Sequence, residues 1–253
     1  MSEIQADVVS EGRRLVERAA RDGLSLRLLG GVAIRLRAQG ELPAAFVRDY
    51  GDLDWVTAKG TSAATQRFFT DAGYSPQTRF NALNGKERLM FFDDVNGRQV
   101  DVFVGTFRMS HEIPMGDRLE LDPVTIPLAE LLLTKLQVAQ LNEKDVRDAL
   151  TLFHQYAVGD GDGSLINGAR VASLCANDWG LWRTFTANLA TCSERIDDLE
   201  LPSDDKTKMA ERLKQLEEWT EREPKSRKWR LRAKIGDRKR WYELPEEVTG
   251  GRE

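Results

Sequence analysis

Two aspartates, Asp52 and Asp54, stand one residue apart in a segment, residues 52–57, that the sequence predicts to be a strand. Side chains two residues apart in a strand point to the same face, so both carboxylates should lie side by side. Like charges at that distance repel each other unless a cation or water lies between them. A divalent cation, bound by carboxylates and substrate phosphates, is one explanation. A solvated loop is the other.

A glycine pair, Gly30 and Gly31, precedes Asp52 by about twenty residues. It follows a short expected strand, residues 24–29, and leads into an expected helix, residues 32–38. Exposed amides of a glycine turn and of a helix start can bind a phosphate group. Arg35 on that helix could approach a triphosphate. The alternative is a turn that binds no ligand.

A third aspartate, Asp101, lies inside the apolar run from Val100 to Val104. The run is expected to be the second strand of a hairpin, residues 87–93 and 98–104, because Asn96-Gly97 is a strong signal for a tight turn. A carboxylate among apolar neighbours is costly to bury unless it is paired or binds a metal. Asp101 is therefore either a third metal ligand or an edge position that faces water.

Lys135 lies on the apolar face of an expected helix that begins at Pro127. Its ammonium group must either reach out to solvent or meet an anion. Asp145 and Asp148 follow, three residues apart on one side of the next expected helix, which runs to about Tyr156. These two acids either belong to a site or interact with the dipole of that helix.

In this order, the glycine pair, the paired aspartates, Asp101 and the Lys135 block resemble the DNA polymerase beta superfamily of nucleotidyltransferases. Within it, the chain is similar to the AbiEii-type group, which includes toxins of bacterial toxin–antitoxin systems. The resemblance covers roughly residues 24–150. The chain departs from many relatives at Gly51, where they often have Ser, Thr or Lys, and at Gly30-Gly31, where they often have Ser beside the glycine.

The resemblance implies transfer of a nucleoside monophosphate from an NTP to an acceptor, with Mg²⁺ as cofactor and Mn²⁺ as the alternative ion. It implies metal binding by Asp52, Asp54 and Asp101, which with Lys135 form the catalytic set. Asp145 would orient Lys135 or the nucleotide, and Asp148 would support the same network. The residues implied in nucleotide binding are Gly30, Gly31, Arg35, Lys135, Asp145 and Asp148.

The pattern predicts an α+β fold, with an N-terminal mixed β-sheet flanked by helices and a mostly helical C-terminal part. The expected division is a nucleotidyltransferase core at residues 1–126, a helical domain completing the active site at 127–221 and a basic tail at 222–253. Further helices are expected at residues 3–22, 61–72, about 165–176, 178–199 and 203–222. The segment GDGDG at residues 159–163 lacks the spacing of a calcium loop and is expected to be a connection.

Charge is distributed unevenly along the chain. Residues 222–240 carry ten Lys or Arg against two acids, a net charge of +8, whereas the whole chain has a net charge of −4. Together with Trp229, Trp241 and Tyr242, this basic tail could bind RNA, with phosphates on the cations and bases on the rings. The alternatives are a solvated basic end and a segment that packs back onto the acidic body.

The sequence also indicates the cellular compartment and the use of cysteine. No apolar run approaches the length of a membrane span and the N-terminus has no signal layout, so we expect a cytoplasmic protein without a membrane partner. The separate cysteines, Cys175 and Cys192, suggest neither a disulfide framework nor a zinc site.

Three functions are compatible with the sequence. The first is NMP transfer to RNA, for example a tRNA, by a toxin-like enzyme with a cognate antitoxin. The second is the same transfer to a small hydroxylated molecule such as an antibiotic. The third is a nucleotide-binding or regulatory module that has the fold without turnover.

Overall fold

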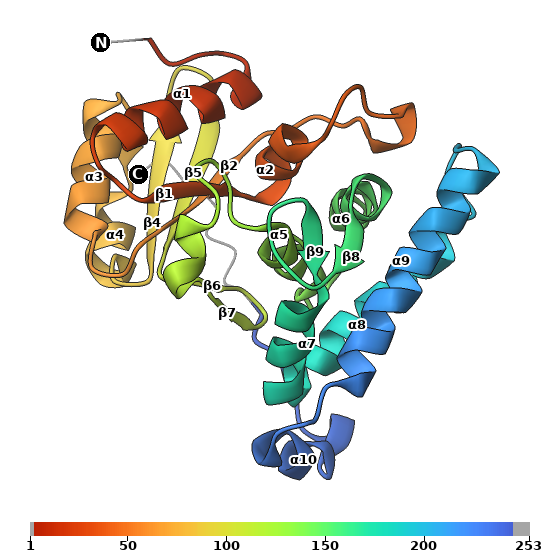
Figure 1. Cartoon of the computed structure of the whole chain (residues 1–253). Coiled ribbons are helices and arrows are strands. Elements are labelled where there is room, and N and C mark those ends of the chain that lie inside the picture. Colours follow the sequence, from red (N-terminus) through yellow and green to blue (C-terminus); the bar gives the residue numbers. More distant parts are fainter. Residues whose placement is uncertain (1–2, 245–253) are drawn as a thin grey trace.

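The first layer of the fold is a five-stranded mixed sheet in the N-terminal half of the chain (Figure 1). The structure is a computed structural model, and it describes residues 3–244. The strand order is β1-β2-β5-β4-β3, and only the pair β2 and β5 is parallel. The strands are β1 (Leu26–Leu29), β2 (Leu53–Thr57), β3 (Ser75–Pro76), β4 (Arg88–Asp93) and β5 (Arg98–Val104).

The hairpin predicted from Asn96-Gly97 is confirmed. Strands β4 and β5 pair antiparallel, with Asp93 opposite Arg98 next to the turn. Gly97 has φ 68° and its amide donates to the carbonyl of Asp93 at 2.8 Å. A residue with a side chain rarely adopts this left-handed conformation, so glycine suits the turn. Strand β5, apolar along most of its length, lies between β2 and β4 in the sheet.

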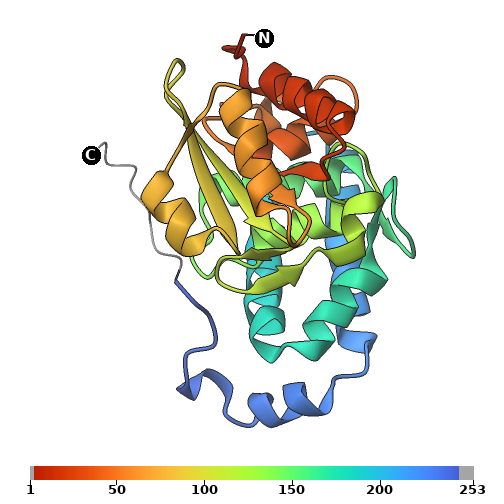
Figure 2. The same ribbon diagram turned by 90° about the vertical axis from the view of Figure 1, so that its left-hand side faces the viewer.

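Helices flank the sheet, as expected. These are α1 (Val8–Arg21), α2 (Gly30–Arg37), α3 (Ser62–Asp71) and α4 (Thr78–Asn84). Figure 2 shows α1 and α3 together on one side of the strands. The first helix begins at Val8 rather than at residue 3, because Asp7 caps it by accepting a hydrogen bond from the amide of Ser10 at 2.8 Å. Helix α4 had no counterpart among the expected helices.

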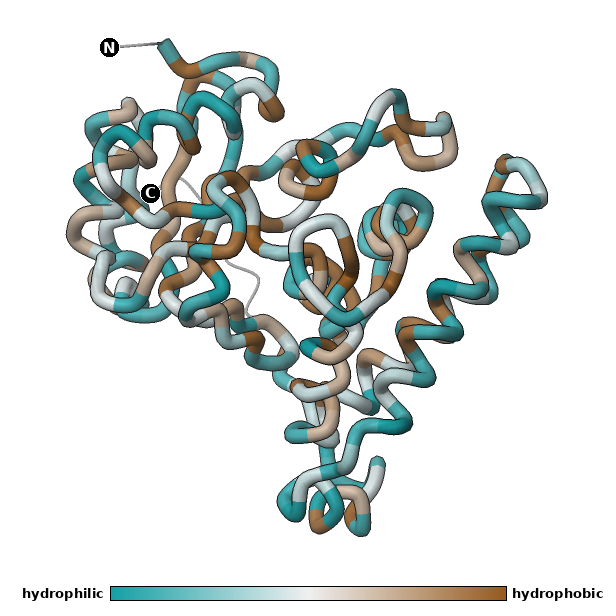
Figure 3. Tube along the Cα trace, in the orientation of Figure 1, coloured by the Kyte–Doolittle hydropathy of each residue, from teal (hydrophilic) through white to brown (hydrophobic). Residues whose placement is uncertain are grey.

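The C-terminal part is mostly helical, as predicted. Its helices are α5 (Leu128–Leu136), α6 (Glu143–Gln155), α7 (Gly168–Asn177), α8 (Trp179–Arg195) and α9 (Ser203–Arg222). The expected start of α7 near residue 165 was wrong, because residues 165–167 form strand β9 and Asn167 caps the helix. Figure 3 shows α9 as a largely hydrophilic helix with isolated hydrophobic residues. Those that are buried, Met209, Leu213 and Leu216, recur at helical spacing.

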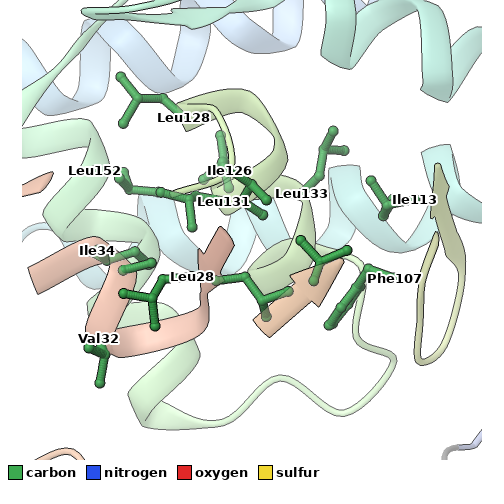
Figure 4. Close-up of a cluster of buried hydrophobic side chains, with 14 of the residues drawn as sticks. Leu28, Val32, Ile34, Phe107, Ile113, Ile126, Leu128, Leu131, Leu133 and Leu152 are labelled. Carbon is green, nitrogen blue, oxygen red and sulfur yellow. The ribbon is translucent and has the colours of Figure 1, made fainter. Parts of the chain in front are cut away.

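Apolar packing joins the two parts of the chain. The backbone of Leu28 on β1 bonds to Val124 and Ile126, each at 3.0 Å, so the chain returns alongside the sheet before α5 begins. Figure 4 shows Leu28 and Ile34 beside Leu131 of α5, within one cluster of buried side chains. This shared core holds α2, β1 and α5 in fixed positions relative to one another.

Two small sheets were not predicted. One is the antiparallel pair β6 (Thr106–Arg108) and β7 (Glu112–Pro114), and the other is the parallel pair β8 (Ala157–Gly159) and β9 (Leu165–Asn167). The GDGDG segment links β8 to β9, as a connection. Strands of three residues carry too little periodicity to be recognised in a sequence.

The basic tail folds back along the body. It contains helix α10 (Arg227–Ala233) and the short helix η3 (Gly236–Arg238), and residues 245–253 of the predicted tail lie outside the described residues. The Trp229 ring lies 5.2 Å from that of Trp182, and the Trp241 ring lies 5.8 Å from that of Trp179. Both partner rings belong to α8. Residues 3–244 contain no helix with the length and apolar character needed to cross a membrane.

Candidate active site

The sheet brings two of the three predicted carboxylates together. In the register of the parallel pair β2 and β5, Asp54 lies opposite Asp101. Asp54 is half-buried and Asp101 is buried. Burial, together with the nearby negative charge of Asp101, raises the pKa of Asp54 to about 7. The two carboxylates are therefore neighbours, and the negative charge of one makes ionisation of the other less favourable.

Asp101 is an interior position, and the alternative of an edge position facing water was wrong. Strand β5 has a neighbour on each side, and Asp101 is only 6% exposed. One of its oxygens accepts a hydrogen bond from Nε of Arg88 at 2.9 Å, and Nη2 of Arg88 lies 2.8 Å from the same oxygen. The other oxygen accepts from Gln99 at 2.7 Å. These two donors compensate the buried charge.

Asp52 lies before the strand rather than in it. Strand β2 begins at Leu53, one residue after the expected start at Asp52. Asp52 is exposed, yet it lies close enough for its charge to raise the pKa of Asp54. Within residues 3–244, no three His, Cys, Asp or Glu side chains gather closely enough to form a metal site by themselves.

The glycine pair lies directly against Asp54. Gly30 and Gly31 form the first turn of α2 rather than a turn before it. Gly30 has φ 71°, and a Cβ atom there would overlap the Oδ2 atom of Asp54. A Cβ atom on Gly31 would overlap the guanidinium of Arg48 and come within 2.9 Å of the Tyr50 ring. A side chain at either position would therefore displace the carboxylate of Asp54 or the guanidinium of Arg48, and the backbone conformation of Gly30 also favours glycine.

Lys135 meets anions of the protein itself. Its Nζ atom lies 3.1 Å from Asp145 and 2.9 Å from Asp148. Lys135 lies in the last turn of α5, which ends at Leu136. Burial alone would lower the pKa of Lys135, but Asp148 and Asp145 outweigh it and raise that pKa. The ammonium group is charged, and the negative charge of Asp54 contributes in the same direction.

Arg48 and Tyr50 belong to this site and were not recognised in the sequence. Arg48 donates to both oxygens of Asp148, at 2.8 and 2.7 Å, and its guanidinium carbon lies 4.3 Å from the centre of the Tyr50 ring. Burial raises the pKa of Tyr50, and the charges of Arg48, Arg35 and Lys135 oppose that rise. Both residues lie outside any helix or strand, and Arg48 lies 100 positions before Asp148, so no local pattern marks them.

Together these residues form a site with two distinct sides. The Asp54 and Asp101 carboxylates can bind a hard cation, and the first turn of α2 brings backbone amides next to them. Arg48 and Lys135 add two cations on the side of α2, where a polyphosphate could be bound. Asp148 connects these cations, because both pair with it. Burial alone would raise the pKa of Asp148, but Lys135 and Arg48 outweigh it and lower that pKa.

No family model matches the chain, and no curated protein matches it. Among solved structures, the chain is similar to an antigenic nucleotidyltransferase-like protein from Paracoccidioides brasiliensis, with 12% sequence identity and a TM-score of 0.40. The similarity covers 81% of this chain and 94% of that one.

Proposed function

We propose that this protein is a nucleotidyltransferase that moves a nucleoside monophosphate from an NTP to an acceptor with the help of Mg²⁺. The observation that carries the proposal is the contact between the first turn of α2 and the carboxylate pair. Gly30, in a left-handed conformation, lies so close to Asp54 that a side chain there would displace the carboxylate, and Asp54 lies opposite Asp101. Phosphate-binding amides and metal-binding carboxylates thus adjoin each other.

The donor set fits Mg²⁺. This ion is usually held by one or two carboxylates and substrate phosphates, so Asp54 and Asp101 suffice without a preformed cluster of three acids. The raised pKa of Asp54 fits the same assignment, because a nearby cation would stabilise its charged form. Asp52, exposed beside them, is the proposed third ligand. When bound, the ion lowers the pKa of the attacking hydroxyl and neutralises charge on the leaving pyrophosphate.

The remaining residues position the nucleotide. The amides at the start of α2 bind phosphate oxygens, and Lys135 and Arg48 stabilise the negative charge of the triphosphate. Asp148 and Asp145 keep Lys135 charged and hold it in place. Arg35, whose charge acts on Tyr50, lies on the same side of the site. Catalysis then consists mainly of orienting the reactants.

One observation favours a second candidate, a nucleotide-binding module without turnover. Both oxygens of Asp101 are occupied, one by Arg88 and one by Gln99. If these contacts persist when a nucleotide binds, most of the roughly four lone-pair sites of the Asp101 carboxylate are used by Arg88 and Gln99, and Asp101 is a weaker metal ligand. The two candidates differ in whether pyrophosphate is released.

The experiment compares pyrophosphate release by the wild-type protein and by Asp54→Asn, with Mg²⁺, each NTP in turn and total cellular RNA. We expect Asp54→Asn to lose about 10²- to 10³-fold of the activity, because the transition state loses charge stabilisation. Asp94→Asn, an exposed position at the hairpin turn, is the matched control and should retain activity. Equal rates in wild type and Asp54→Asn would contradict the proposal, and stabilisation by NTP without pyrophosphate would favour the second candidate.

A further inference from the structure

A groove lies on the β4 side of Asp101, away from β2 and α2. It is a groove of about 1120 Å³ between the β4–β5 part of the sheet, helix α4 and the end of the described tail. The groove residues used below are Lys59, Phe80, Lys86, Arg88, Phe103, Arg108, Arg240 and Tyr242. Figure 2 shows the tail, in blue, rising beside α4 after it crosses below the helical part.

We propose that this groove binds the acceptor, and that the acceptor is the unpaired end of a nucleic acid strand. The inference rests on the proposed function. The groove is connected to the carboxylates by one residue, because Arg88 both lines the groove and pairs with Asp101 at 2.8 Å. A group bound at this wall is therefore within reach of the atoms that react.

The order of elements across the sheet supports this placement. The strands β1, β2, β5 and β4 are successive neighbours in the sheet. The first turn of α2 follows β1. Asp54 lies on β2, Asp101 on β5 and Arg88 on β4. In phosphoryl transfer, the attacking and leaving oxygens lie roughly in line on opposite sides of the phosphorus. If the triphosphate occupies the side of α2, the acceptor must approach from the side of β4. The groove opens on that side.

The chemistry of the lining suits a single strand. Phe80 of α4 and Tyr242 of the tail are partly exposed aromatic rings, on which bases can stack. Lys59 and Lys86 are exposed, and no carboxylate of residues 3–244 lies within ion-pair distance of either. They can therefore contact phosphates without first losing a partner.

The lining of the groove carries more positive than negative charge. Glu87, Glu112 and Glu243 all lie within ion-pair distance of Arg108. With Lys59, Lys86, Arg88 and Arg240 included, the charged side chains of the lining have a net charge of +2. Arg240 adds a further exposed cation, with its guanidinium 4.9 Å from the centre of the Tyr242 ring. The groove thus retains positive charge for an anionic strand.

The tail is fixed where it forms the wall. The indole of Trp241 donates to Thr184 on α8 at 3.0 Å, and the amide of Glu243 donates to the carbonyl of Ser110 at 3.1 Å. Tyr242 lies between these two anchors. Its ring is therefore held at the groove by contacts on both sides.

The test is binding of a fluorescein-labelled, unstructured RNA of about twelve nucleotides to the full chain, measured by fluorescence anisotropy at one fixed salt concentration. We expect Phe80→Ala, Tyr242→Ala and Lys86→Gln each to weaken binding by about tenfold, which is the effect of losing one stacked base or one phosphate contact. Tyr242→Phe should bind as wild type, because it keeps the ring. Lys228→Gln, an exposed cation on α10 outside the groove, is the matched control.

The outcomes separate this inference from the proposed function. Loss of binding confined to the groove variants supports the groove as the acceptor site. Three results would overturn the inference: wild-type affinity in all three groove variants, an equal loss of affinity in Lys228→Gln, or no binding of RNA by the wild-type protein. This holds even if pyrophosphate is released with a small hydroxylated acceptor. Failure of the proposed function has a different signature, namely RNA bound in the groove but no pyrophosphate released with any NTP.

Discussion

At the scale of single residues, Gly30 gives the sharpest prediction. Gly30→Ala places a methyl group against Oδ2 of Asp54 and forces a non-glycine residue to φ 71°. We expect a loss of about 1–2 kcal/mol in the free energy of unfolding, because the left-handed conformation is costly for alanine, and a much larger loss of transfer activity. Denaturant unfolding and pyrophosphate release measure the two effects. Gly40→Ala is the control, because Gly40 also has a positive φ but open space around it.

Retention of activity in Gly30→Ala would contradict the role of the first turn of α2. Gly40→Ala should lose a similar amount of stability through strain and keep its activity. A loss of activity in both variants would show that strain alone accounts for the effect.

Lys135 gives a second prediction at this scale. Lys135→Met removes the cation shared by Asp145 and Asp148, so the proposed phosphate site loses positive charge. We expect KM for the NTP to rise by about tenfold or more, corresponding to at least about 1.4 kcal/mol. Steady-state kinetics checks this, with Lys144→Met, an exposed lysine in the first turn of α6, as the control. An unchanged KM would remove Lys135 from the nucleotide site.

Some of these residues could be identified from the sequence because they are charged residues in apolar segments. Asp101 in a β-branched strand and Lys135 on a leucine-rich helix each required a partner, and the structure supplies one for both. Arg48 and Tyr50 were missed because they lie in an irregular segment, where arginine and tyrosine are ordinary. Their place in the site depends on a contact with Asp148 that only the tertiary fold creates.

At the scale of elements, the β4–β5 hairpin has a titratable anchor. Asp93, fully buried, accepts hydrogen bonds from Arg98, including one at 2.8 Å from Nε, and from the amides of Val95 and Asn96. Burial alone would raise the pKa of Asp93, but hydrogen bonds from Asn96 and Arg98 outweigh it and lower that pKa. Stability from this group is therefore present above the unfolded pKa of about 3.9 and lost as the pH falls through the lower folded value.

This linkage predicts the behaviour of Asp93→Asn. We expect it to lose about 2 kcal/mol in the free energy of unfolding at pH 7, because Arg98 is left buried without its counter-charge. Below pH 3 the difference from wild type should shrink. Urea unfolding at both pH values measures it, and Asp94→Asn at the exposed neighbouring position is the control. A difference that stays constant with pH would show that the charge of Asp93 is not the cause.

Element prediction succeeded where local signals were strong. The Asn96-Gly97 turn placed both hairpin strands to within one residue, and the apolar periodicity of α8 and α9 marked long helices. It failed at α4, at the three-residue strands and at the first residues of α1 and α7. Those features depend on capping by Asp7 and Asn167, or on pairing with distant segments, more than on local periodicity.

At the scale of the whole molecule, the tail is the feature that the sequence described least well. Its positive charge was evident, but the tryptophans proposed to stack on bases pack instead against Trp179 and Trp182 of α8. Residues 222–240 contain ten Lys or Arg, and eight of these side chains are exposed. The tail therefore combines a surface that can meet an anionic partner with an anchor that fixes the segment beside the sheet.

This anchoring predicts a measurable change in protection. Trp241→Ala removes both the contact with Trp179 and the hydrogen bond to Thr184, so the segment after η3 should open more often. We expect trypsin to cleave after Lys239 or Arg240 roughly tenfold faster, as resolved by mass spectrometry of the peptides. Leu231→Ala, at an exposed position on α10, should leave the rate unchanged. Equal rates in wild type and Trp241→Ala would show that Trp241 does not hold the tail in place.

The measurement that tests the central claim most directly is label transfer from two forms of each NTP, one labelled at the α-phosphate and one at the γ-phosphate. The protein is incubated with Mg²⁺ and total cellular RNA, and the products are separated by denaturing electrophoresis. We predict label on a discrete RNA from the α-labelled NTP alone, with none when Asp54→Asn replaces the wild type. Label from the γ-phosphate, or no label and no pyrophosphate with any NTP, would contradict nucleotidyl transfer.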